Sequence, residues 1–274
     1  MDEADIAQPE SLFFPSGYQE DATQVHAFFY PPTNANYQGL ANELPLVIAL
    51  CHGGPTGATD SGLNLKIQYW TNRGFAVVDI NYRGSTGFGR SYRQALAGNW
   101  GIADVEDTQS AIRYLAEQQK IDPERCLIRG GSAGGYTVLS ALTFTDTFKA
   151  GASLYGIGDL ETLATDTHKF ESRYLDSLIG PYPERRDIYL ERSPIHHAEG
   201  LNCPVIFLQG LEDKVVPPNQ AEMMVELLTE KGIKVDYVTF PDEGHGFRKA
   251  NNIIRAMESE LSFYQDVFNL AGKA

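Results

Sequence analysis

One serine in this chain lies in a setting that is typical of a catalytic nucleophile. Residues 130–134 read GGSAG, and Ser132 follows a short apolar run and precedes a predicted helix. A G-x-S-x-G sequence between a strand and a helix predicts a strained turn that exposes the serine hydroxyl. Glycine costs backbone entropy in ordered elements, so this cluster indicates that neighbouring segments pass close by. The helix starting at Ala133 would direct backbone N–H groups toward an oxyanion.

A serine hydroxyl is a weak nucleophile without a general base, and His245 is the predicted base. His245 lies in FPDEGHGF, after a predicted strand that ends at Phe240, and glycines flank it. In enzymes with this turn the chain order is Ser, then Asp or Glu, then His. A structural role is predicted for the histidines that lack this context, namely His26, His168, His196 and His197.

The acid that orients the histidine is expected after the strand between Ser132 and His245. The segment PVIFLQGLEDKVVPP ends a predicted strand at Gly210 and offers Glu212 and Asp213. A carboxylate there would hold the tautomer of the imidazole and stabilise the imidazolium. Asp213 is the preferred candidate and Glu212 the competitor. Asp242 is close to His245 in sequence and is predicted to shape its loop.

An oxyanion hole needs a second donor besides the Ala133 N–H. The segment ALCHGGPTGAT follows the strand that ends near Cys51, where a loop of this type supplies a backbone N–H. Gly53 and Gly54 would let the chain approach the substrate oxygen. His52 has no second metal ligand spaced near it, so a structural or oxyanion-loop role is predicted, and no metal site is expected.

The elements that position these residues alternate between strands and helices. Most predicted strands are continuously apolar, which is typical of a parallel sheet covered on both faces. The predicted strands are 23–30, 44–51, 74–82, 125–130, 150–156, 204–210 and 234–240, and the predicted helices are 61–73, 104–119, 133–145, 219–232 and 250–269. This alternation predicts an α/β fold with a mostly parallel, doubly wound sheet.

Two parts of the chain depart from this alternation. Before about residue 44 the pattern favours antiparallel strands at one sheet edge. Residues 157–203 are irregular and are predicted to pass over one end of the sheet. No linker or repeat interrupts the chain, so residues 1–274 are predicted to form one domain.

Composition narrows the partners and the compartment. The net charge of -14 argues against a nucleic-acid partner, because phosphate binding needs a basic surface. The three cysteines form no C-x-x-C pair, and the acidic start resembles no signal peptide. No apolar run approaches the length of a membrane span. A cytoplasmic protein without membrane association is therefore expected.

Five linked motifs together resemble the catalytic domain of the prolyl oligopeptidase family of serine peptidases, and most closely its acylaminoacyl-peptidase and dipeptidyl-aminopeptidase branch. They are HGGPTGAT, NYRGSTGFGR, GGSAGGY, GLEDKVVPP and EGHGF, and they extend from about residue 45 to the end. The resemblance implies an α/β-hydrolase fold with helices on both faces of the sheet. It also implies a Ser132–His245–Asp213 triad and oxyanion donors at Ala133 and Gly54.

The resemblance also bears on substrate binding and on what surrounds the domain. Tyr136 and Val215 are the predicted substrate-binding positions. Many relatives carry Arg or Asn at the position of Val215, where it anchors a substrate carbonyl, so this chain departs from them. Tyr82 and Arg83 are predicted to be scaffold residues. Family members usually carry a β-propeller before this domain, and the chain is expected to be a fragment of a longer protein or to lack that domain.

The predicted function is hydrolysis of peptide bonds in short peptides through an acyl-enzyme, as a dipeptidyl or acylaminoacyl exopeptidase. The expected substrate is a short peptide or an acylated amino acid, and no cofactor is needed. Two alternatives are a carboxylesterase acting on small esters and a catalytically silent interaction domain. The sequence leaves open whether the chain forms a homo-oligomer.

Overall fold

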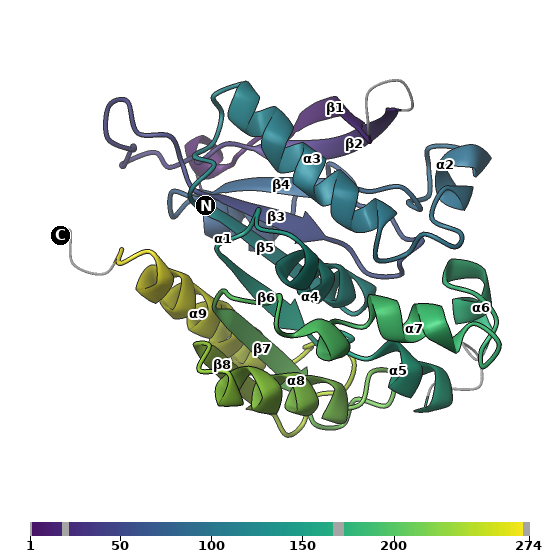
Figure 1. Ribbon diagram of the computed structural model, residues 1–274. Coiled ribbons are helices and arrows are strands. Elements are labelled where there is room, and N and C mark those ends of the chain that lie inside the picture. The colour runs from purple at the N-terminus through teal and green to yellow at the C-terminus, as the bar shows by residue number, and fades with distance from the viewer. Residues whose placement is uncertain (1, 18–21, 167–172, 271–274) are drawn as a thin grey trace.

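A twisted sheet of eight strands forms the centre of the protein in a computed structural model, which describes residues 2–17, 22–166 and 173–270. Helices pack against it on both sides (Figure 1). The strands are β1 (Glu10–Ser16), β2 (Thr23–Tyr30), β3 (Val47–Cys51), β4 (Ala76–Asn81), β5 (Cys126–Gly131), β6 (Ala150–Leu154), β7 (Val205–Gly210) and β8 (Val235–Phe240).

The strand order is β1-β2-β4-β3-β5-β6-β7-β8. All neighbouring strands from β4 to β8 pair in parallel, whereas β2 runs antiparallel to both β1 and β4. Every residue of β4, β6 and β7 is buried, as expected for parallel strands covered on both faces. Since the parallel strands share one direction, the loops after β3, β5, β7 and β8 meet at one edge of the sheet.

The sheet separates two hydrophobic cores, one on each of its faces. The longer helices and those near the site are α1 (Leu65–Thr71), α2 (Arg90–Gln94), α3 (Ala103–Glu117), α4 (Ala133–Phe144), α8 (Asn219–Glu230) and α9 (Ala250–Val267). One core lies between the sheet and α3, α4 and α8, and the other lies beneath α1 and α9. The placement of α4 directly after β5 carries Ser132 to the edge of the sheet.

The predicted α/β-hydrolase fold is confirmed, including the antiparallel strands at one edge. The described part of residues 157–203 contains three short helices, α5 (Leu160–Asp166), α6 (Tyr174–Leu178) and α7 (Arg186–Arg192), followed by a 3-10 turn (Pro194–His197). These helices lie at the end of the sheet where the active-site loops gather (Figure 1). His168 lies outside the described residues.

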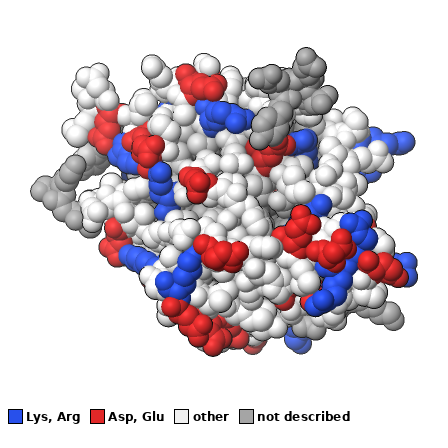
Figure 2. Space-filling view, in the orientation of Figure 1, with Lys and Arg blue, Asp and Glu red and all other residues white. Residues whose placement is uncertain are grey.

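Charged side chains are interspersed on the face shown in Figure 2. Lysine and arginine alternate there with aspartate and glutamate, and the described residues of this face present no broad basic area. Among the described helices, none is both long and apolar enough to span a membrane.

Candidate active site

Ser132 occupies the turn between β5 and α4 in a strained backbone conformation. Its φ of 58° and ψ of -124° lie in a region that non-glycine residues rarely adopt. The Ser132 N–H donates to the Leu154 carbonyl at 2.9 Å, and the Ser132 carbonyl accepts the Tyr136 N–H at 3.1 Å. The turn is therefore fixed by β6 on one side and by the first turn of α4 on the other.

The glycines around Ser132 are required by close backbone approach. A Cβ atom on Gly134 would lie 2.1 Å from the Cys51 carbonyl oxygen, and one on Gly130 would lie 2.3 Å from the Gly134 oxygen. Both distances are far below van der Waals contact, and the opposing atoms belong to backbone. The loop after β3 and the nucleophile turn can therefore pack together only when both positions lack a side chain.

His245 joins the predicted nucleophile to the predicted acid. Its Nε2 atom lies 2.9 Å from Oγ of Ser132, and its Nδ1 atom lies 2.8 Å from Oδ2 of Asp213. The hydrogen bonds match a neutral imidazole that carries its proton on Nδ1 and accepts from the serine hydroxyl on Nε2. The structure brings these three residues together although they lie on three different loops.

Asp213, and not its neighbour Glu212, faces the imidazole. The other Asp213 oxygen accepts the backbone N–H groups of Val215 and Val216 at 2.8 and 2.9 Å, and the Asp213 side chain is fully buried. Glu212 is exposed, and its N–H donates to the Glu243 carbonyl at 2.9 Å. Because two backbone N–H groups hold one carboxylate oxygen of Asp213, the other oxygen is fixed in a position that faces His245.

The HGGP loop approaches Ser132 from the end of β3. A Cβ on Gly53 would lie 3.6 Å from Cβ of Ser132, and Gly54 lines a pocket together with Ser132 and Ala133. The Ala133 N–H begins α4 and has no intrahelical acceptor. Gly54 and Ala133 thus border the same space beside the Ser132 side chain.

His52 stabilises the HGGP loop through contacts of its ring. Its Nδ1 atom donates to the Gly53 carbonyl at 2.8 Å, its Nε2 atom pairs with the Ser85 hydroxyl at 2.7 Å, and its ring stacks on Tyr82. Desolvation by burial lowers the pKa of His52, so the ring is neutral. Tyr82 also donates its hydroxyl to the His52 carbonyl at 2.8 Å. These contacts agree with the predicted structural roles of both residues.

An apolar pocket adjoins Ser132 on the α4 side of the sheet. Trp100, Ile157, Leu163, Tyr174, Leu175, Val215 and Val216 line it with Gly54, Pro55, Ser132 and Ala133. The predicted substrate-binding residue Val215 is thus in place. Tyr136 is not: it is fully buried behind Trp100 and donates its hydroxyl to the Arg192 carbonyl at 2.9 Å. Its expected contact with substrate is corrected to support of the pocket wall.

The comparisons with known proteins agree with this geometry. A family model described as the prolyl oligopeptidase family matches residues 61–271. The chain belongs to the prolyl oligopeptidase family. A dipeptidyl aminopeptidase BIII from Pseudoxanthomonas mexicana is 34% identical over 225 residues, which are 80% of this chain and 33% of that protein. The predicted serine-peptidase family is thereby confirmed.

Two further proteins are similar to this chain over most of its length. An acylamino-acid-releasing enzyme of Arabidopsis thaliana is 29% identical over 232 residues, covering 81% of this chain and 30% of its own. A solved puromycin-hydrolyzing peptidase of Mycobacterium tuberculosis is 46% identical with a TM-score of 0.95, and the match covers 97% of this chain and 40% of that one. The chain therefore spans about a third to two fifths of the length of these relatives.

The family motif NYRGSTGFGR serves as a scaffold in this member, as expected from the sequence. The Arg83 guanidinium bonds the buried Asp107 carboxylate through Nε at 2.9 Å and also pairs with Glu106. Asp107 accepts the Ser16 hydroxyl at 2.6 Å as well. The loop after β4 is thereby held against α3, which also bonds the edge strand β1.

Two contributors to the site were not singled out from the sequence, although one of them, Glu243, belongs to the EGHGF motif. Tyr155 packs edge-on against the His245 ring at a centroid distance of 4.9 Å, from a backbone conformation with φ of 40°. Glu243 is buried, and its carboxylate accepts the N–H groups of Arg248 and Lys249 at 3.1 and 2.8 Å. These contacts fix the ring and the loop of His245. Asp242 pairs with Lys249 and shapes the same loop, as predicted.

Among the described residues, the other histidines apart from His52, namely His26, His196 and His197, take no part in the hydrogen-bonded series at Ser132. His26 is buried in β2, where its Nδ1 atom accepts a hydrogen bond from the Asn81 amide and its Nε2 atom lies 3.0 Å from the Ser11 hydroxyl. Desolvation lowers the pKa of His26. His196 and His197 lie in the 3-10 turn after α7. Within the described ranges, no group of three His, Cys, Asp or Glu residues is placed to hold a metal ion.

Proposed function

We propose that this chain hydrolyses amide bonds of short peptides through an acyl-enzyme on Ser132. The observation that carries the proposal is the continuous hydrogen-bonded series from Ser132 through His245 to Asp213, with contacts of 2.9 and 2.8 Å. Its members have the residue types and the order that serine hydrolases use. Membership of the prolyl oligopeptidase family favours a peptide as the substrate.

The reaction has two half-steps that share one set of groups. His245 accepts the Ser132 proton on Nε2 while Oγ attacks the carbonyl carbon, and backbone N–H groups of Ala133 and Gly54 stabilise the oxyanion. The imidazolium then gives the proton to the leaving amine. Water attacks the resulting ester by the same route and regenerates the Ser132 hydroxyl. Asp213 stabilises the imidazolium in both half-steps.

The acyl side of the substrate is assigned to the apolar pocket beside Ser132. Its walls are apolar and aromatic, so they favour an uncharged side chain. The cavity is small, about 40 Å³, which leaves room for roughly a few water molecules or a side chain of modest size. Dipeptidyl and acylaminoacyl substrates, which the relatives' names indicate, remain the proposed classes.

Labelling by an organophosphonate probe tests the role of Ser132. The wild-type chain should be labelled and should hydrolyse aminoacyl anilides, whereas Ser132→Ala should lose both properties. Ser91→Ala removes an exposed hydroxyl on α2 and should keep both. Full hydrolysis by Ser132→Ala would overturn the proposal.

A second assay separates a peptidase from an esterase on the same triad. The proposal predicts turnover of both aminoacyl anilides and short-chain p-nitrophenyl esters, since both classes use the same nucleophile. Cleavage of the esters alone would assign the chain to small esters. A folded wild-type chain that neither reacts with the phosphonate nor cleaves either substrate would be an interaction domain.

A further inference from the structure

A second cavity lies under Ser132 on the other face of the sheet, between α1, β5 and α9. Its volume is about 190 Å³. Its lining includes Gly131 and Gly246, which are the chain neighbours of Ser132 and His245. The apolar pocket belongs to the core of the α4 face, whereas this cavity borders the core beneath α1 and α9. The two cavities therefore extend from the candidate nucleophile in different directions.

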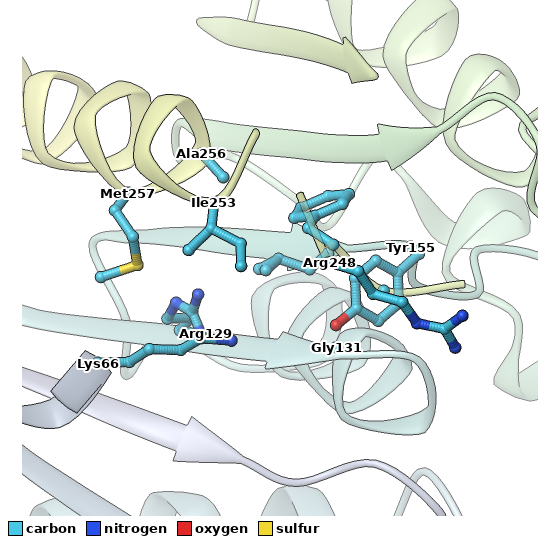
Figure 3. Close-up of a pocket in the computed structure, with 11 residues that line it drawn as sticks. Lys66, Arg129, Gly131, Tyr155, Arg248, Ile253, Ala256 and Met257 are labelled. Atoms are coloured by element: carbon cyan, nitrogen blue, oxygen red, sulfur yellow. The ribbon is translucent and has the colours of Figure 1, made fainter. Parts of the chain in front are cut away.

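Three basic residues line this cavity, which is called the basic pocket below. Lys66 comes from α1, Arg129 from β5 and Arg248 from the loop after His245. Figure 3 shows Lys66 and Arg129 near each other at one end of the pocket, and Arg248 toward Tyr155 and Gly131 at the other. Basic side chains from three separate elements thus lie along the pocket, and Arg248 is at the end that borders the catalytic residues.

The positive charge of the basic pocket is only partly balanced. Arg129 donates through Nε to the buried Glu260 carboxylate at 2.7 Å. Among the described residues, neither the Lys66 ammonium nor the Arg248 guanidinium has a hydrogen-bonded or ion-paired partner. Desolvation and, second, repulsion from Arg129 lower the pKa of Lys66, although the residue remains exposed. Lys66 and Arg248 are exposed, so their charged ends are accessible to an anion that enters the pocket.

We propose that the basic pocket binds the carboxylate of the leaving group, so that the enzyme prefers short peptides with a free C-terminus. The proposal rests on the proposed function of Ser132. With the acyl side chain in the apolar pocket, the leaving group must extend to the other side of the nucleophile, where Gly131 and Gly246 border the basic pocket. Ammonium and guanidinium groups are the side chains that bind carboxylates most strongly.

Binding of the carboxylate adds no covalent step to the reaction. His245 still gives its proton to the amine as the carbon–nitrogen bond breaks, and the leaving peptide departs as an amine with its carboxylate unchanged. Lys66 and Arg248 orient the leaving group through charge. The preference should therefore appear in kcat/KM for substrates that carry this carboxylate and not for those that lack it.

Trialanine, its C-terminal amide and an alanine anilide form a suitable set of probes. In the wild-type chain we expect kcat/KM for trialanine to exceed that for the amide by about tenfold, the scale of one charge-assisted hydrogen bond. Lys66→Met should remove most of this preference by lowering the value for trialanine alone. Arg248→Met should reduce the same ratio. Lys149→Met removes a lysine at the far end of β6 and serves as the matched control.

Each result of this assay decides between the two proposals. An equal kcat/KM for trialanine and its amide in the wild type, or an unchanged ratio in both variants, overturns the carboxylate site while peptide hydrolysis stands. An equal loss on all three substrates in Lys66→Met assigns the lysine to the fold instead, and an equal shift by Lys149→Met assigns the effect to net charge. Absence of cleavage and of phosphonate labelling in the wild type removes both proposals.

Discussion

The Nδ1 atom of His245 lies 2.8 Å from Oδ2 of Asp213, a carboxylate whose other oxygen is held by two backbone N–H groups. Because those amides fix the carboxylate, the imidazole can present only its Nε2 lone pair to Ser132. The orientation of the base is thus set by the loop after β7, which is far from the nucleophile in sequence. This relationship makes Asp213 the most informative residue to change after Ser132.

Asp213→Asn should lower kcat for an aminoacyl anilide by about 10⁴-fold, because the amide favours the wrong imidazole tautomer. Glu212→Gln is the matched control, since Glu212 is the exposed neighbour and the competing candidate from the sequence. It should stay within about twofold of the wild type, as expected of a surface substitution. Steady-state kinetics on both variants checks the assignment, and a large loss in Glu212→Gln would reverse it.

Gly134→Ala should destabilise the fold, because the new Cβ would meet the Cys51 carbonyl oxygen at 2.1 Å. The opposing atoms belong to backbone and cannot move aside easily, so we expect a loss of about 1–3 kcal/mol in the free energy of unfolding. Gly39→Ala places a methyl group where nothing lies within 4 Å and should leave stability nearly unchanged. Urea unfolding of the two variants tests this, and equal midpoints would contradict the close approach.

The sheet and the triad were predictable because their signals are local. A continuous apolar run marks a buried parallel strand, and Ser132 and Asp213 follow such strands, β5 and β7, within three residues, whereas His245 follows the half-buried edge strand β8. Strand β1 was not assigned individually, since Pro15 within Glu10–Ser16 is tolerated only because the strand lies at the sheet edge. The helices α5, α6 and α7 have five to seven residues each and depend on tertiary packing, which no local pattern reports.

The rest of the site depends on contacts between distant segments. Tyr155 reaches His245 only because β6 places it beside Gly131, where a Cβ would lie 2.9 Å from its ring. Tyr136 follows the nucleophile motif, yet the turn of α4 directs it into the core behind Trp100. Packing decides which way a helical side chain points. The short distance in sequence from Ser132 to Tyr136 therefore did not show whether Tyr136 contacts the substrate.

Leu175→Ala should change which acyl side chains are accepted. Leu175 lines the small apolar pocket, so truncation opens space for a larger group. We expect the ratio of kcat/KM for a phenylalanine anilide to that for an alanine anilide to rise about tenfold. Leu228→Ala removes another buried leucine, in α8, at a comparable cost in stability and should leave the ratio unchanged. An equal change in both variants would argue against the pocket assignment.

Asp104 beneath α4 should make stability depend on pH. It is fully buried and accepts hydrogen bonds from the Gly101 N–H and the Thr137 hydroxyl, both at 2.6 Å. Desolvation raises its pKa from 3.8 to about 6. The folded state therefore holds a proton that the unfolded state has lost between these values, and its contribution to stability decreases as pH rises through about 6.

Asp104→Asn removes this titration and isolates its contribution. We compare the unfolding free energy of the variant with that of the wild type at each pH. As the pH rises from roughly 4 to roughly 7, this difference should shift in favour of the variant by on the order of 2 kcal/mol, because one pKa unit corresponds to about 1.36 kcal/mol. Asp79, whose pKa burial also raises to about 6, titrates in both proteins and cancels in the difference. Asp146→Asn changes an exposed carboxylate and should show no such trend. Urea unfolding at several pH values measures the difference, and a difference that is constant with pH would show that Asp104 stays ionised throughout.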